Sequence, residues 1–142
     1  MISLALKLQI ERARLIQLDK KWPKLYWAID LHDTIIPSSR TLGYESKVLF
    51  DGAKEALQEI SKRDDQCIIL WTATNPDVVW SEIVSWLDTY NIHVSYHNEN
   101  PECKSEKYAR FGGKFYFDVL LDDKAGFNIT WWKDIDQIVR SW

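Results

Sequence analysis

Residues 3 to 20 alternate apolar and charged side chains at helical spacing. One face carries Leu4, Leu8, Leu15 and Leu18, with Leu6, Ile10 and Ala13 beside it. Such a stripe is typical of an amphipathic helix, and Pro23 ends the helical region of residues 1–23. Because this helix precedes every strand, we expect its apolar stripe to pack against the core, a partner or a second copy of the chain.

Downstream, short apolar runs alternate with segments of helical periodicity. The runs that predict strands are residues 25–30, 66–71, 93–96 and 115–121, with 127–131 as a candidate fifth. Helical patterns cover residues 52–63, 76–90, 104–111 and the final stretch with Ile135, Ile138 and Val139. This alternation predicts an α/β fold, a doubly wound three-layer sandwich whose central, mainly parallel sheet has helices on both faces.

The segments between these elements are short and polar. Residues 35–49 are turn-rich and predict a surface flap, while Asp51 is placed to cap the helix that follows it. Pro76 suits the first position of the next helix. The chain contains no linker or low-complexity stretch, so we expect one domain over residues 1–142.

The composition adds limits rather than a function. A net charge of −3 over 142 residues gives no electrostatic reason for broad nucleic-acid binding. The two cysteines, Cys67 and Cys103, form neither a disulfide framework nor a metal-ligand spacing, which favours a reducing cytoplasm. No run approaches the ~20 apolar residues of a membrane span, so we expect no membrane partner.

Polar side chains stand directly after three of the predicted strands: Asp30, Thr72 and the pair Asp122–Asp123. Parallel strands end along one edge, where open α/β sheets bind ligands, so we expect these groups to converge. The helix expected from residue 104 starts at the same edge, which brings in Lys104 or Lys107. Lys114 precedes its strand, and at ~3.3 Å per residue it would lie at the opposite edge.

In chain order these groups are an acid, a hydroxyl, a lysine and an acid pair. This order resembles the four motifs of the haloacid dehalogenase (HAD) superfamily of phosphotransferases. Its first motif, Asp-x-Asp-x-Thr, corresponds here to Asp30-Leu31-His32-Asp33-Thr34. The others correspond to Thr72, to Lys104 and to Asp122-Asp123, with Asn128 as a supporting residue, so the resemblance covers residues 25–128.

The resemblance implies a Mg²⁺-dependent phosphomonoester hydrolase. Asp30 would attack a phosphoryl group and form an aspartyl-phosphate that water then hydrolyses. Mg²⁺ would be bound by Asp30, by Asp122 or Asp123, and by the main-chain carbonyl of His32. Lys104 would neutralise charge in the transition state. The residues implied to bind the phosphorylated substrate are Thr34, Thr72, Ala73 and Asn128.

Position 32 departs from the family pattern, which usually has an aspartate there as general acid/base. This chain has His32, followed by an additional acid at Asp33. Imidazole titrates near pH 6.5 and could perform the same proton transfers, and Asp33 could replace it from one position later. A third interpretation is a degenerate HAD-like module that binds or assembles without turnover.

A further alternative is a protein of another functional class. A receiver domain of bacterial signalling also has an acidic pocket, a threonine and a lysine, but its acid pair follows the first strand rather than a late one.

Within the enzyme interpretation, residues 35–71 are too few for a large helical cap. Capless relatives tend to act on bulky substrates, so we expect a nucleotide or a nucleic-acid end. The partners expected are a phosphorylated substrate, small or macromolecular, and a second copy of the chain through the N-terminal helix.

Overall fold

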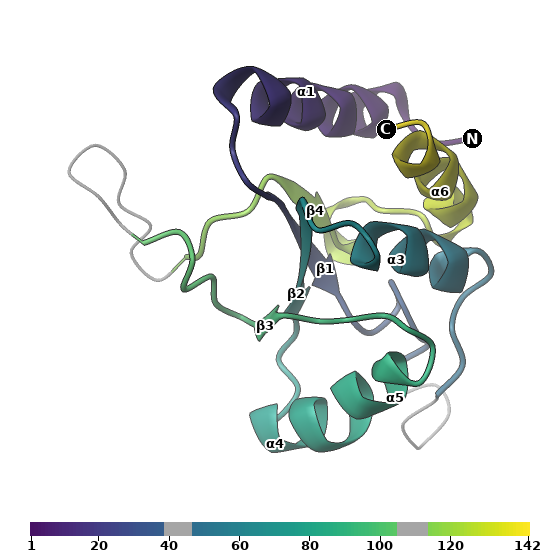
Figure 1. The fold of residues 1–142 in the computed structure, drawn as a ribbon. Coiled ribbons are helices and arrows are strands. Elements are labelled where there is room, and N and C mark those ends of the chain that lie inside the picture. Colours follow the sequence, from purple (N-terminus) through teal and green to yellow (C-terminus); the bar gives the residue numbers. More distant parts are fainter. Residues whose placement is uncertain (39–46, 105–113) are drawn as a thin grey trace.

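A computed structural model describes residues 1–38, 47–104 and 114–142 and places a parallel sheet at the centre of the molecule (Figure 1). The four strands are β1 (Leu25–Asp30), β2 (Gln66–Trp71), β3 (Tyr96–His97) and β4 (Val119–Leu121). They lie in the order β3-β2-β1-β4, every pair is parallel, and helices flank the sheet. The expected α/β class is therefore confirmed.

The register of the central strands sets the position of every residue at the sheet edge. β1 and β2 are aligned over their full length, so that Asp30 lies opposite Trp71. On its other side β1 pairs with β4, where Ile29 lies opposite Leu121. Residues directly after β2 and β4 therefore leave the sheet beside Asp30.

The helices are α1 (Leu4–Lys20), α3 (Ala53–Ser61) and α6 (Trp132–Arg140), with a three-part segment between β2 and β3. That segment consists of α4 (Pro76–Val78), a π-helical stretch over Val79–Val84 and α5 (Ser85–Asp88). Their buried side chains form one core with the strand residues Leu25, Trp27, Ile29, Ile68 and Leu70. Alternation along the strands places those five side chains on one face of the sheet.

The opposite face carries a smaller cluster of Tyr26, Cys67 and Ile69. Within the described ranges, the partly buried residues on this cluster are Tyr96 of β3 and Cys103, Phe115 and Tyr116, which lie outside helices. Of the short helix expected over residues 104–111, all but the first residue lies outside the described residues. The second helical layer of a doubly wound sandwich therefore stays a prediction.

Several expected strands differ from the observed ones. The candidate fifth strand over 127–131 is wrong, because Ile129–Trp131 is a 3₁₀ turn in which the N–H of Thr130 donates a hydrogen bond to the Asn128 side chain. The third strand pairs only at Tyr96–His97, beyond most of the expected 93–96. The fourth strand pairs over three residues, and the expected residues 115–118 precede it.

Asp51 does not cap the helix that follows it. α3 begins after Gly52, which has φ +84° and no side-chain cap, while the Asp51 carboxylate lies 2.9 Å from the Lys133 ammonium. A Cβ at Gly52 would lie 2.8 Å from the Lys133 side chain and 3.3 Å from that of Trp132. Gly52 is therefore required for two reasons: its backbone is left-handed, and α6 approaches it too closely for a side chain.

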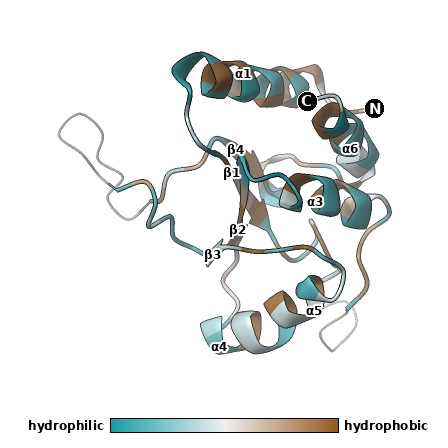
Figure 2. Cartoon of the chain, in the orientation of Figure 1, coloured by the Kyte–Doolittle hydropathy of each residue, from teal (hydrophilic) through white to brown (hydrophobic). Residues whose placement is uncertain are grey.

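Helix α1 packs through a different face from the one expected. Ile10 is fully buried and Leu6 and Ala13 pack beside it, while Arg14 forms a 2.6 Å salt bridge with Asp65. The residues that remain exposed, with 54% to 69% of their surface accessible to solvent, are Leu4, Leu8, Leu15 and Leu18. Figure 2 shows hydrophobic and hydrophilic residues alternating along this helix. The leucine stripe does not pack on the core, and its pairing with a partner or a second copy stays a prediction.

Among the described residues, no helix is both long and apolar enough to cross a membrane.

This difference between the two faces of α1 predicts unequal effects of truncation. Ile10→Ala should lower the free energy of unfolding by about 2–5 kcal/mol, because it leaves a cavity in the core. Leu15→Ala on the exposed stripe should change it by about 0.5 kcal/mol or less. Urea denaturation of dilute protein measures both values. Equal losses would contradict the packing of α1.

Candidate active site

A hollow of about 620 Å³ opens at the carboxyl edge of the sheet. The expected site residues that line it are Asp30, His32, Asp33, Thr72, Ala73 and Asp122. They come from three separate parts of the chain, the ends of β1, β2 and β4 and the residues that follow. The convergence expected from the strand order is therefore present.

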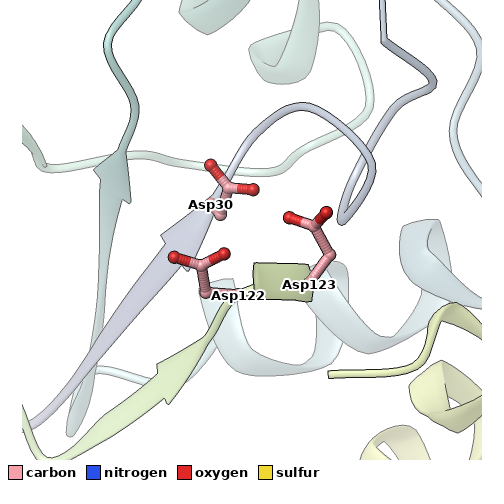
Figure 3. A group of neighbouring side chains, drawn as sticks. All are labelled: Asp30, Asp122 and Asp123. Carbon is pink, nitrogen blue, oxygen red and sulfur yellow. The ribbon is translucent and has the colours of Figure 1, made fainter. Parts of the chain in front are cut away.

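Three carboxylates meet beside this hollow. Asp30, Asp122 and Asp123 each offer an oxygen, and these oxygens all lie within 4.8 Å of one another (Figure 3). All three residues are half-buried. Like charges at this spacing repel, and a bound proton or cation would relieve that repulsion.

Thr34 connects the strands that supply these acids. Its hydroxyl donates a 3.2 Å hydrogen bond to Asp30 Oδ2 and accepts a 3.1 Å hydrogen bond from the main-chain N–H of Asp123. Its carbonyl accepts a 2.8 Å hydrogen bond from the indole of Trp132. Thr34 is fully buried. It therefore positions the acids and cannot contact a substrate in the way that the resemblance implied.

The proximity of the acids changes the protonation of Asp30. Burial raises the pKa of Asp30 to about 7, and a hydrogen bond with Asp123 and the charge of Asp122 act in the same direction. The Thr34 hydroxyl opposes this increase by hydrogen-bonding the charged form. A carboxyl group with a pKa this far above 3.8 is a common feature of functional sites.

The turn after β2 is held by a side chain that sequence reasoning missed. The Asn98 amide group accepts a 2.9 Å hydrogen bond from the N–H of Thr72 and donates one of 2.7 Å to its carbonyl. The Thr72 hydroxyl accepts a 3.2 Å hydrogen bond from the N–H of Thr74. Asn98 and Thr74 both line the hollow. Asn98 has φ +54° directly after β3, a backbone state that asparagine tolerates better than most residues, but nothing in the sequence linked it to Thr72.

His32 and Asp33 both line the hollow, so the structure keeps the two acid/base alternatives open. His32 is half-buried. Asp33 is exposed, has φ +61°, and accepts a 2.9 Å hydrogen bond from the N–H of Ser38. Whether the His32 main-chain carbonyl contributes to a metal site stays a prediction.

The structure does not bring every expected residue to this site. Lys104 is exposed and is not among the described residues that line the hollow, and Lys107 lies outside the described residues. The lysine that lines the hollow is Lys124, directly after the acid pair. Asn128 uses its side-chain oxygen to accept hydrogen bonds from the N–H and hydroxyl of Thr130. It therefore caps its own turn instead of facing the site.

The donor set fits a hard divalent cation. Mg²⁺ prefers carboxylate and water oxygens and keeps several waters when bound by one or two carboxylates. Asp30, Asp122 and Asp123 supply such oxygens at one point beside an open hollow. Since every ligand of this triad is an oxygen, the donors are less suited to metals that prefer sulfur or imidazole.

The pKa of Asp30 predicts how stability varies with pH in metal-free buffer. Because its pKa is about 7 in the folded chain and near 3.8 in a free side chain, the folded state holds a proton that the unfolded state releases. The free energy of unfolding should therefore fall between pH ~4 and ~7, by about 1–2 kcal/mol after allowance for solvent screening. Asp30→Asn should remove this fall and be the more stable protein at pH 8. Urea denaturation with EDTA at pH 5 and pH 8 tests this, and identical pH dependence of both proteins would contradict it.

Comparison of the chain with protein-family models, with curated proteins and with solved structures finds no match.

Proposed function

We propose that this protein is a Mg²⁺-dependent phosphomonoester hydrolase that acts through Asp30. The observation that carries this proposal is the meeting of Asp30 with Asp122 and Asp123 beside an open hollow. The motif order along the chain supports an assignment to the HAD-like class without a large cap. So does the position of β4, which supplies the acid pair and lies next to β1.

The acidic triad is the part of the site that would hold Mg²⁺. When bound, the cation would neutralise the carboxylates and the charge that develops on a transferred phosphoryl group. A cation bound there would favour the deprotonated form of Asp30, whose carboxylate would then be available as a nucleophile. The raised pKa of Asp30 supports this coupling.

The proposed reaction uses the chain's own groups. A carboxylate oxygen of Asp30 attacks phosphorus, the ester P–O bond breaks, and the leaving alkoxide takes a proton from His32 or Asp33. Water then attacks the aspartyl-phosphate and gives its proton to the same group, which releases inorganic phosphate and restores Asp30. Thr72 and Lys124 line the hollow, and their hydroxyl and ammonium groups would bind phosphoryl oxygens there.

A second candidate is an HAD-like module that binds a phosphorylated ligand or a partner without turnover. The observation that favours it is His32 at the position where the family usually has its acid/base aspartate. The exposed leucine stripe of α1, composed of Leu4, Leu8, Leu15 and Leu18, offers a surface for such a role. Binding of Mg²⁺ without hydrolysis of any phosphomonoester would favour this candidate.

Replacement of the nucleophile provides the main test. Asp30→Asn should lower kcat for p-nitrophenyl phosphate in Mg²⁺ by about three orders of magnitude or more, because the amide cannot form the covalent intermediate. Asp64→Asn, an exposed acid before β2, is the matched control and should retain the wild-type rate. Omission of Mg²⁺ should reduce the wild-type rate to background. Wild-type turnover equal to that of Asp30→Asn would remove Asp30 as the nucleophile.

A pair of variants separates the two acid/base alternatives. If His32 transfers the protons, His32→Ala should lower kcat by about 10²- to 10⁴-fold and alter the pH profile, while Asp33→Asn has the smaller effect. The reverse order would assign the role to Asp33. Rates of hydrolysis of an alkyl phosphomonoester, whose leaving alkoxide needs a proton, measure both from pH 5 to pH 9. An undiminished rate in His32→Ala excludes the histidine from proton transfer.

A further inference from the structure

A row of aromatic rings starts at the rim of the hollow, and its middle ring packs on the smaller cluster. Trp71, the last residue of β2, lines the hollow and is 44% exposed. Its ring centroid lies 5.7 Å from that of Phe115, which lies 5.8 Å from that of Phe117. Phe117 is itself 37% exposed. The two ends of the row therefore present aromatic surface to solvent.

The register places Trp71 beside the proposed nucleophile. Trp71 lies opposite Asp30 in the neighbouring parallel strand, one residue before Thr72. Paired residues of adjacent strands point to the same face, about 4.8 Å apart. Phe115, against which the indole leans, packs on the cluster of Tyr26, Cys67 and Ile69, which lies back from the sheet edge. The indole is therefore set beside the acids rather than over them.

This arrangement suits a substrate that carries its phosphate and its aromatic group at a distance from one another. In an aryl phosphate the ring is bonded to the ester oxygen and would stay over the hollow. In a nucleoside monophosphate the ribose separates the phosphate from the base, which allows the base to reach a ring beside the acids. Aromatic side chains bind nucleic-acid bases by stacking, with little preference for sequence.

We propose that Trp71, supported by Phe115, is the stacking surface for the base of a nucleoside monophosphate whose phosphate lies at Asp30. The ligand is a free nucleotide or the terminal nucleotide of a single strand, which share this chemistry. This inference rests on the proposed hydrolase function for the position of the phosphate. It assigns to Trp71 the recognition of the leaving group and to the acids the chemistry.

Two probes that differ only in the base test the stacking surface. The wild-type protein in Mg²⁺ should hydrolyse adenosine 5′-monophosphate with a kcat/KM about 5- to 150-fold above that for ribose 5-phosphate, as expected for one stacked base. Trp71→Leu should reduce this ratio to near one. Trp80→Leu is the matched control, because Trp80 is 42% exposed and does not line the hollow, and it should keep the wild-type ratio. A ratio near one in the wild type, or a ratio unaffected by Trp71→Leu, would overturn the inference.

Calorimetric binding of the same two probes separates this inference from the proposed function. Tighter binding of the adenosine compound, lost in Trp71→Leu, with no turnover of either probe would refute the hydrolase and retain the stacking surface. Equal turnover and equal binding of both probes would refute the stacking surface and retain the hydrolase. A higher kcat/KM for phosphotyrosine than for the adenosine compound would overturn the inference in favour of an aryl phosphate.

A third probe distinguishes a free nucleotide from a strand end. A 5′-phosphorylated dinucleotide has a second base that could reach Phe117 at the far end of the row. A kcat/KM above that of adenosine 5′-monophosphate, lost in Phe117→Leu, would support a strand end. A value at or below that of the mononucleotide would support a free nucleotide.

Discussion

The parallel pairing of β1 with β2 and β4 is the constraint on which the site depends. Each strand brings polar residues to the same edge, and the register places Trp71 opposite Asp30 and Leu121 opposite Ile29. Acids that are distant in the sequence therefore become neighbours without any local motif that holds them together. Burial of the apolar core on the helical face supplies the free energy that holds the strands together, since the acids themselves repel one another.

The interactions around the acids show how the fold tolerates that repulsion. Thr34 is buried beneath the cluster and hydrogen-bonds both Asp30 and the N–H of Asp123, while the indole of Trp132 holds the Thr34 carbonyl. These bonds hold the Asp30 carboxylate and the main chain of Asp123 in place but do not remove the charge of the acids. A proton on Asp30 relieves part of the repulsion, and a cation at the triad would do the same, so the proposed metal binding would depend on pH. Well-packed apolar residues at these positions would be more stable, so the acids lower the stability of the fold.

The sequence predicted the parts of the fold that depend on local pattern. The bounds of β1 and β2 match the expected ones, because both contain a continuous apolar run, which stops at Asp30 in β1 and just before Thr72 in β2. The remaining strands were misjudged because β3 and β4 are short pairings whose ends depend on their neighbours, and because Asn128 diverts its segment into a turn. At the site, the acids and Thr72 follow from strand order, but Asn98 and Lys124 do not. Their positions depend on how loops meet in three dimensions, which the periodicity of apolar residues along the chain does not predict.

In the proposed reaction, Asp30 becomes covalently phosphorylated during turnover. Borohydride reduces an acyl phosphate to the alcohol, so an aspartyl-phosphate at position 30 would be recovered as homoserine. The most direct measurement is to quench the protein with borohydride while it turns over adenosine 5′-monophosphate in Mg²⁺, and then to map its peptides by mass spectrometry. If Asp30 is the nucleophile, homoserine is expected at position 30 only when substrate and Mg²⁺ are both present. Release of phosphate with an unmodified Asp30, or with another acid reduced in its place, would contradict it.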